Sequence, residues 1–421
     1  MIAGTSLAER VRSLLAEAAA VYRDRPRALA LVRAHLTRLD EPVRVAVAGR
    51  SGTGKSTLVS ALDARVSRHS PGRDVVFLDM PALAALGERE EDPVVRQLAA
   101  EADAVVFLAR HPEADQLSRL PAASGSALAR QTAVTSILAL SRADEVGAGR
   151  IDALIAAKQL ARRSRTDDAC APFQTVVAVA GQLALGGITL QENEFAALAL
   201  LASVPRAELD RFLLSVDEFV SERFPVRLDQ SSRRVLLAKF GLFGVRLTTT
   251  LIRTGCDSAM KLSAQLVQRS GFTELRDAVD TYFVARGDVV KARTALLALE
   301  TMLDAEPHRQ RELLTARLEQ ITAGAHDFRE LRLIAALHGG RVDWPEELTT
   351  EAMCLLGAHG TDVPDRLGLD GEPDEGAAFS TAIAALGRWR HRAEAPETAP
   401  AERAAARVVV RSCEGILARF D

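Results

Sequence analysis

The chain has almost no excess of either charge and few aromatic side chains, and each of these limits the classes of protein to which it can belong. The formal net charge is only −3 over 421 residues, so no global basic field attracts nucleic acid, and we expect no nucleic-acid partner. Aromatic residues make up 4% of the chain. Ala and Leu dominate instead, which favours a largely helical fold.

Cysteine is also scarce, and its spacing argues against a metal centre. The four cysteines, Cys170, Cys256, Cys354 and Cys413, are widely separated, and no two of them have the spacing of metal ligands. We therefore expect reduced thiols in a cytoplasmic protein.

Long uncharged apolar runs are absent. The nearest approach to a membrane span is residues 235–252, which Lys239 and Arg246 interrupt. The N-terminal segment carries charges within its apolar pattern, unlike a secretory signal. We expect a cytoplasmic protein without a membrane span. Peripheral contact with the inner face of the plasma membrane stays open: residues 240–252 are either its site or a buried helix whose Arg side chains reach the surface.

What is present is a series of five short, Val-rich apolar runs separated by helical patterns. The runs are residues 43–49, 74–79, 102–109, 135–141 and 175–181. Continuous apolar strands between helices are typical of a parallel sheet covered on both faces, so this part is predicted to be a doubly wound α/β domain.

Helical periodicity dominates the rest of the chain. Residues 6–39 read as two amphipathic helices, and Ser6 with Glu9 has the pattern of a capping box. We predict an α/β plus all-α protein. A P-loop (phosphate-binding-loop) NTPase domain (41–188) is inserted between N-terminal helices (1–40) and an antiparallel helical neck and trunk bundle (189–421), which those helices join.

Residues 49–56, GRSGTGKS, match the P-loop pattern G-x-x-x-x-G-K-[ST] between a Val-rich strand and a helix. Glycines let the backbone form a nest of N–H groups around phosphate oxygens, Lys55 reaches the β and γ phosphates, and the helix N-terminus adds its dipole. We interpret the match as phosphate binding; the alternative is a chance match in a glycine-containing loop. The predicted nucleotide contacts here are Gly49, Ser51, Gly52, Thr53, Gly54, Lys55, Ser56 and Thr57.

A magnesium site is predicted beside this loop. The Ser56 hydroxyl is placed to ligate Mg²⁺, and Asp79 ends a hydrophobic strand, where P-loop proteins commonly hold the ion directly or through water. The alternative for Asp79 is an acidic residue at a strand end without a ligand.

The segment SRAD, residues 141–144, predicts the base. It follows the fourth apolar run, at the sheet edge where ligands bind in such folds. Guanine presents two parallel N–H donors that one carboxylate accepts, so Asp144 is predicted to bind the base and Arg142 to pack along it. The loop around Gly181, from Ala180 to Gln182, would offer backbone N–H groups to the guanine O6. The alternative for Asp144 is a helix cap.

Several further segments carry a family resemblance. Residues 141–154, 213–220, 239–247 and 266–292 resemble parts of the dynamin-like GTPases of actinobacteria, most closely the isoniazid-inducible type, and the similarity covers most of the chain. The resemblance implies a dynamin-type GTPase head on a helical neck and trunk, with GTP or GDP and Mg²⁺ bound. It also implies membrane remodelling, tolerance of cell-wall drugs, and assembly as a homo-oligomer or with a dynamin-like paralogue.

The sequence departs from this family in the parts that position water. Residues 57–78, between the P-loop and Asp79, are too few for the first switch of a dynamin-like head with its Mg²⁺-ligating Thr. The second switch reads D-M-P-A, residues 79–82, in place of D-x-P-G, so Ala82 lacks the freedom of Gly. We assign no catalytic residue and expect a weak or partner-dependent GTPase.

Two other interpretations stay open. One is a nucleotide-binding or nucleotide-free pseudo-GTPase that serves as a helical scaffold. The other is an ATP-using P-loop enzyme, which the short spacing to Asp79 tolerates and Asp144 argues against.

Overall fold

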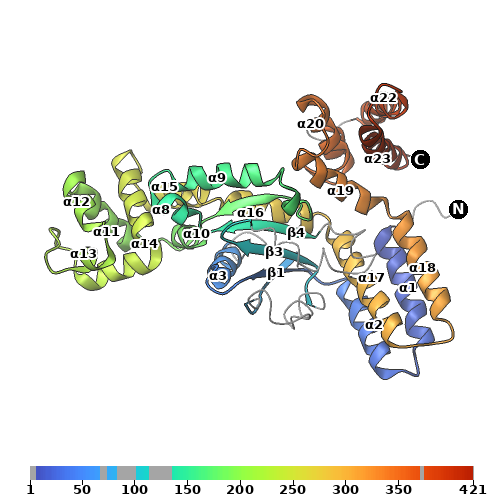
Figure 1. The fold of residues 1–421 in the computed structure, drawn as a ribbon, viewed down its shortest axis with the longest axis horizontal. Coiled ribbons are helices and arrows are strands. Elements are labelled where there is room, and N and C mark those ends of the chain that lie inside the picture. The colour runs from blue at the N-terminus through green and yellow to red at the C-terminus, as the bar shows by residue number, and fades with distance from the viewer. Residues whose placement is uncertain (1–5, 67–73, 83–100, 113–134, 370–373, 421) are drawn as a thin grey trace.

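A computed structural model of the chain describes residues 6–66, 74–82, 101–112, 135–369 and 374–420. The molecule is elongated, with a sheet in the middle and helical groups at both ends (Figure 1).

All five strands of the sheet are parallel, which confirms the predicted parallel sheet. They are β1 (Val43–Gly49), β2 (Val75–Asp79), β3 (Ala104–Ala109), β4 (Ser136–Ser141) and β5 (Val176–Val179). Their order is β2-β1-β3-β4-β5, so β1 lies between β2 and β3. Each strand falls within one of the five apolar runs.

Helices cover both faces of this sheet. On one face lie α3 (Lys55–Val66), α10 (Gly181–Ile188) and α16 (Phe272–Val279), which pack on side chains such as Ile137 and Ala139. On the other face α9 (Ala153–Ser164) packs on Leu138 and Leu140. Neighbouring residues of β4 are thus buried on opposite faces, which is why the strand is apolar throughout.

The two N-terminal helices pack against helices that are far along the chain. Helices α1 (Leu7–Val21) and α2 (Pro26–Arg38) form a four-helix group with α17 (Gly287–Ala305) and α18 (Arg311–Gly324), around one apolar core. Ser6 and Glu9 form the capping box that starts α1. The sheet is therefore inserted between the two halves of this group.

The remaining helices lie in two further groups, where a single bundle was predicted for residues 189–421. The group at the far end of the sheet, here called the lateral lobe, is α11 (Glu192–Ser203), α12 (Arg206–Phe212), α13 (Val216–Val220), α14 (Gln230–Arg253) and α15 (Ala259–Arg269). The other, here called the C-terminal lobe, is α19 (His326–His338), α20 (Glu346–Leu355), α21 (Val363–Leu367), α22 (Glu375–Glu394) and α23 (Pro400–Leu417). The sheet domain lies between the two lobes, and each lobe shares an apolar core with it.

Helix α14 contains residues 240–252, whose environment the sequence left open. It is the one helix of the described residues with the length and composition of a membrane span, and half of its most apolar window is buried inside the protein. Phe240 and Phe243 are buried, Lys239 pairs with Glu194 at 2.6 Å, and Gly241 kinks the helix with φ +65°. These contacts are those of a helix packed within the lateral lobe.

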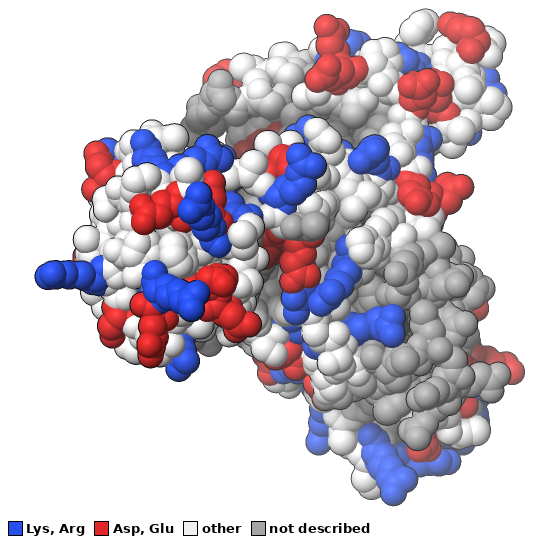
Figure 2. Space-filling view, turned by 60° about the vertical axis from the view of Figure 1, so that its left-hand side comes forward, with Lys and Arg blue, Asp and Glu red and all other residues white. Residues whose placement is uncertain are grey.

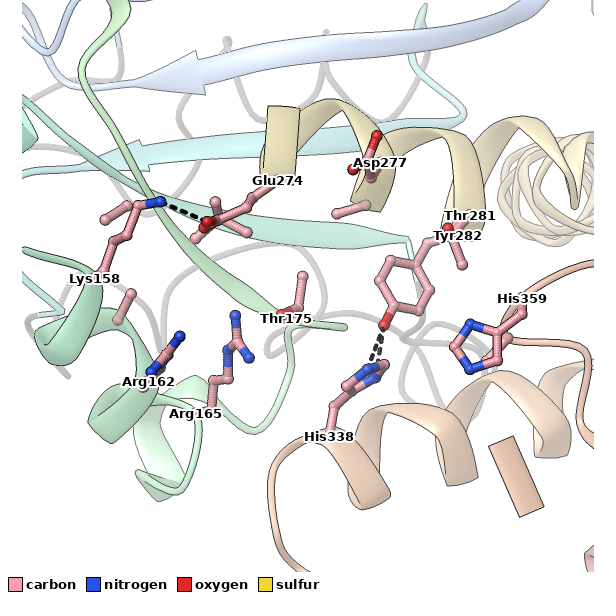
Figure 3. A pocket seen from close by; sticks show the side chains of 15 residues that line it. Lys158, Arg162, Arg165, Thr175, Glu274, Asp277, Thr281, Tyr282, His338 and His359 are labelled. Atoms are coloured by element: carbon pink, nitrogen blue, oxygen red, sulfur yellow. Dashed lines mark hydrogen bonds and ion pairs between the residues drawn. The ribbon is translucent and has the colours of Figure 1, made fainter. Parts of the chain in front are cut away.

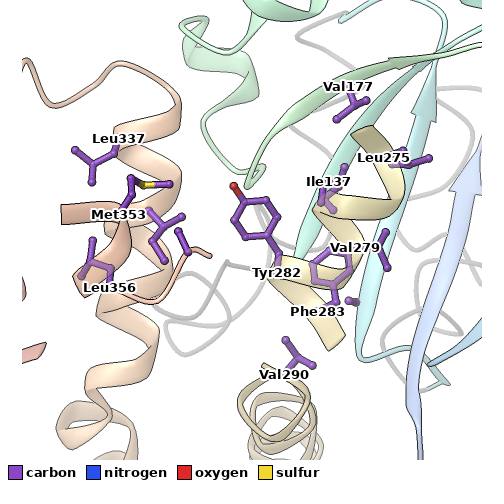
Figure 4. Close-up of a cluster of buried hydrophobic side chains, with 14 of the residues drawn as sticks. Ile137, Val177, Leu275, Val279, Tyr282, Phe283, Val290, Leu337, Met353 and Leu356 are labelled. Atoms are coloured by element: carbon purple, nitrogen blue, oxygen red, sulfur yellow. The ribbon is translucent and has the colours of Figure 1, made fainter. Parts of the chain in front are cut away.

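The C-terminal lobe meets the sheet domain through a short π-helical turn, η3 (Asp280–Val284), that follows α16. Tyr282 and Phe283 on this turn are buried, and Figure 4 shows Tyr282 between the sheet side, with Val177, and the lobe, with Leu337. One continuous apolar core therefore joins the two.

A buried ion pair connects the N-terminal helices to the sheet. Arg38, at the end of α2, lies 3.0 Å from Asp103, just before β3, and both side chains are at most 10% exposed. The second Asp103 oxygen accepts a hydrogen bond of 3.0 Å from the backbone N–H of Arg44 in β1. Asp103 thus holds together α2, β1 and β3.

Removal of this carboxylate should destabilise the protein strongly. In Asp103→Asn, Arg38 keeps its buried positive charge and loses the carboxylate that faces it, so we expect the free energy of unfolding to fall by roughly 3–5 kcal/mol. Urea denaturation measures the change. As a control, Asp40→Asn removes the exposed pair with Arg12 and should change the free energy of unfolding far less, because solvent screens that pair. Similar losses in the two variants would contradict this role for Asp103.

Candidate functional site

The carboxyl ends of β1, β4 and β5 meet at one edge of the sheet, around a small pocket of about 90 Å³. The pocket is lined by Thr53, Gly54, Thr57, Leu58, Leu108, Ser141, Arg142, Asp144, Glu145, Val179, Gly181 and Gln182. The structure thus brings together the P-loop, the SRAD segment and the start of α10, which are far apart in the sequence.

The P-loop backbone depends on its glycines. A Cβ atom on Gly49 would lie 2.5 Å from the carbonyl oxygen of Leu108 in β3, and the φ angle of Gly49 is +152°. Gly52 and Gly54 have φ angles of +75° and +91°, and nothing lies within 4 Å of a Cβ built on either. The loop therefore passes close to β3 and then leaves open space beside its tip, as a phosphate cradle requires.

The loop also stabilises itself. The carbonyl oxygen of Arg50 accepts a hydrogen bond of 2.8 Å from the Thr53 hydroxyl and one of 3.3 Å from the Lys55 ammonium. Helix α3 begins at Lys55, so Ser56 and Thr57 lie in its first turn, where backbone N–H groups lack intrahelical acceptors. Ser51 and Ser56 are exposed. Thr53, Gly54 and Thr57 line the pocket, whereas Gly49, Ser51, Gly52, Lys55 and Ser56 lie outside its lining.

Asp79 lies at the carboxyl end of β2, exposed and outside the lining of the pocket. It is paired in register with Val47, two residues before Gly49. The Ser56 hydroxyl and the Asp79 carboxylate are oxygen donors of the kind that Mg²⁺ prefers. The described residues contain no group of three or more His, Cys, Asp or Glu that could hold a metal, so Mg²⁺ here would need phosphate oxygens to complete its ligands. The donor set fits Mg²⁺ that enters with a nucleotide.

Arg142 links the SRAD segment to the P-loop. Its Nε donates a 3.0 Å hydrogen bond to the carbonyl oxygen of Gly52, and its guanidinium pairs with Glu145. It has a φ angle of +54°, and the other described residues with positive φ are all glycines. Such a conformation costs energy and is held here by the two side-chain contacts. The guanidinium of Arg142 thus forms part of the pocket wall beside the P-loop.

Asp144 lies half-buried in the pocket wall. Burial raises the pKa of its carboxyl above the ordinary value, and Glu145 adds to the increase. Asp144 does not cap the helices that follow: the N-cap residues of α8 (Val146–Gly149) and α9 are Glu145 and Asp152. The helix-cap alternative for Asp144 is therefore wrong, and its carboxylate is available to a ligand.

The start of α10 offers fewer donors than the sequence suggested. The N–H of Ala180 already donates to the carbonyl oxygen of Ser270 at 2.8 Å. Gly181 and Gln182 are the first residues of α10, so their backbone N–H groups have no intrahelical acceptor. The Gln182 side chain turns away, and its Nε2 donates to the carbonyl oxygen of Ala238 in α14 at 2.9 Å.

Sequence reasoning missed Glu145 and Leu108. Glu145 pairs with Arg142 and also lies 3.8 Å from Arg110 after β3. Its spacing of three residues from Arg142 could have predicted this pair, because side chains three residues apart on a helical turn are close enough to form a salt bridge. The role of Leu108, whose carbonyl oxygen limits the space at Gly49, had no signal in the sequence.

Comparison with curated proteins finds relatives along the whole chain. The isoniazid-induced protein IniC of Mycobacterium tuberculosis, in each of two strains, is 32% identical over 490 aligned residues, which cover 99% of this chain and 99% of the relative. No family model and no solved structure matches the chain.

The close approach of Gly49 to β3 predicts a clear cost of substitution. Gly49→Ala should lower the free energy of unfolding by roughly 1–3 kcal/mol, because the new methyl group overlaps the Leu108 carbonyl and the φ angle disfavours Ala. Gly181→Ala is the matched control, since its Cβ would lie 3.8 Å from Leu58 in a helix that favours Ala. Urea denaturation compares the two variants. A Gly49→Ala protein as stable as the control would show that the loop does not need this glycine.

Proposed function

Because this chain belongs to the family of isoniazid-induced IniC proteins, we propose that it is a guanine-nucleotide-binding, dynamin-like protein with weak or partner-dependent GTPase activity. The observation that carries the proposal is the pocket in which the P-loop, Asp144 and the first turn of α10 meet. The meeting of these three segments, which are separate in the sequence, supports a single nucleotide site.

The residues of this site divide the recognition of GTP or GDP between them. Backbone N–H groups of the P-loop and Lys55 bind the phosphates, and the helix dipole of α3 supports the negative charge. Ser56 and Asp79 would hold Mg²⁺, which neutralises phosphate charge when bound. Asp144 accepts the two N–H groups of guanine, and the backbone N–H of Gly181 donates to its O6.

Weak turnover is supported by the short path from the P-loop to β2. Only residues 67–74 lie between the end of α3 and β2, and β2 pairs directly with β1. The sequence therefore has little room for a first switch, which the resemblance places in this interval. The exposed Asp79 is followed by Met80, Pro81 and Ala82 in place of a glycine-containing switch. Without these parts an attacking water is poorly oriented, so hydrolysis is slow.

We place the protein in the cytoplasm, with action at the inner face of the plasma membrane, as a homo-oligomer or with a dynamin-like paralogue. The relatives are isoniazid-induced proteins, which supports a role in tolerance of cell-wall drugs. Figure 2 shows Lys and Arg intermixed with Asp and Glu on the visible face, so charge alone gives little attraction to anionic lipid there. Apolar side chains of the lateral lobe offer surface for contact, since Leu214 and Met260 are 78% and 79% exposed.

A second candidate is a pseudo-GTPase that serves as a scaffold with little or no nucleotide. The pocket of about 90 Å³ favours it, because ligand pockets usually span about 300–1,000 Å³ and the Arg142 side chain, hydrogen-bonded to Gly52, forms part of the wall. An ATP-using enzyme is the third reading, and Asp144 argues against it.

Nucleotide preference is a direct test of the base site. By calorimetry, GTP and GDP should bind more tightly than ATP, and Lys55→Ala should abolish binding. Asp144→Asn should weaken GTP by about tenfold or more and favour xanthine nucleotides, because the amide donates to the 2-oxo group. Asp152→Asn, an exposed position outside the pocket, should leave GTP affinity unchanged. Equal or tighter binding of ATP would contradict the guanine assignment.

Phosphate release separates the GTPase from the scaffold. The purified protein alone should release phosphate from GTP on the order of 10⁻³ s⁻¹ or more slowly, the range of GTPases without a stimulating partner. Liposomes or a full-length paralogue should accelerate it, with Lys55→Ala as the background. Binding of GTP with no release above that background under any of these conditions would favour the scaffold, and rapid release by the protein alone would contradict the incomplete switch.

A further inference from the structure

A second and larger cavity lies beside β5, the outermost strand of the sheet, away from the nucleotide pocket. Its volume is about 280 Å³, and it is walled by α9, by β5, by α16 with η3, and by the C-terminal lobe. Because β5 is an edge strand, the cavity opens where a further strand would otherwise pair. Ligand pockets commonly form at such junctions between domains.

Two arginines at the end of α9 line this cavity: Arg162 in its last turn and the C-cap residue Arg165. Arg165 is half-buried, and its Nε donates a hydrogen bond of 3.1 Å to the carbonyl oxygen of Val176 in β5. Burial is the main cause that lowers the pKa of the Arg165 guanidinium and the neighbouring Arg162 adds to it, whereas Tyr282 and Glu274 raise it. Arg162 is exposed, and no described residue accepts a hydrogen bond from its guanidinium.

The two acidic side chains in the cavity lining form their salt bridges with cations other than Arg162 and Arg165. Glu274 accepts a hydrogen bond of 2.6 Å from Lys158, and Asp277 lies 3.7 Å from Arg276. Figure 3 shows Lys158 and Glu274 joined by a dashed line, with Arg165 nearer than Arg162 to Tyr282 and His338. The guanidinium groups of Arg162 and Arg165 therefore have no salt bridge to a carboxylate among the described residues.

Neutral donors complete this arrangement. Thr175, the residue before β5, is buried with its hydroxyl free of any partner among the described residues. Tyr282 shares a hydrogen bond of 2.6 Å with Nδ1 of His338, and His359 lies beyond them in the wall (Figure 3). Guanidinium forks with hydroxyl and imidazole donors match the several oxygens of a phosphate group better than a single carboxylate.

We propose that this cavity binds the phosphate group of a small phosphate monoester, with Arg162 and Arg165 as its charged ligands. The volume admits a phosphate and a few further atoms, and Asp277 at the rim accepts hydroxyl groups of the remainder. Since the walls come from the sheet domain and from the C-terminal lobe, the bound ester links the two. The same chemistry is offered by a soluble sugar or polyol phosphate and by the monoester headgroup of phosphatidic acid.

Calorimetry with the full chain and glycerol 3-phosphate tests the soluble source, with glycerol as the blank. The expected result is one saturable site that Arg162→Gln weakens by about tenfold or more, because a charged hydrogen-bond donor is lost. Arg163→Gln, the neighbouring exposed arginine outside the cavity lining, should leave the affinity unchanged. The site should persist in Lys55→Ala, which separates it from phosphate binding at the P-loop.

Sedimentation with phosphatidylcholine vesicles, with and without phosphatidic acid, tests the lipid source. Binding that requires phosphatidic acid and is lost in Arg162→Gln but not in Arg163→Gln supports the proposal with a headgroup as ligand. Tyr282→Phe, which removes one hydroxyl only, should weaken whichever probe binds. The proposal is overturned if neither probe binds, if Arg162→Gln leaves the affinity for both unchanged, or if Lys55→Ala abolishes the signal.

Discussion

The parallel direction of all five strands is the constraint on which the rest of the structure depends. Parallel strands end at the same edge of a sheet, so segments that follow β1, β4 and β5 must meet there. The P-loop, the SRAD segment and the start of α10 are these segments. Parallel pairing also needs crossover helices on both faces, which explains why the strands are apolar along their whole length and why α9 lies opposite α16.

The helical groups are connected to this sheet by a few specific contacts. Asp103 ties α2 to β1 and β3, and Tyr282 with Phe283 joins the sheet to the C-terminal lobe. At the candidate pocket, Gln182 donates a hydrogen bond to Ala238 of α14, and the Ala180 N–H donates to Ser270, between α15 and α16. The start of α10 is therefore in direct contact with the lateral lobe.

Much of the fold could be predicted because its signals are local. Five Val-rich runs became five parallel strands, and Ser6 with Glu9 became the capping box of α1. The distribution of the later helices over separate groups could not be predicted, since an apolar stripe shows that a helix is buried but does not identify its neighbour. The same limit applied to residues 240–252, whose apolar pattern fits a membrane surface and a packed helix equally well until Phe240 and Lys239 are seen among their partners.

At the candidate site, the sequence alone was enough to predict which residues would carry the chemistry. The glycines, Lys55 and Ser56 of the P-loop and Asp144 of SRAD are recognisable because backbone nests and base-pairing carboxylates need those residue types at those spacings. Only the folded chain shows that Arg142 donates to the carbonyl oxygen of Gly52, that the Ala180 N–H already has an acceptor, and that Arg162 and Arg165 line a cavity beside β5. These features arise from pairs of atoms that are distant in the chain, and such pairs exist only after the strands have been placed side by side.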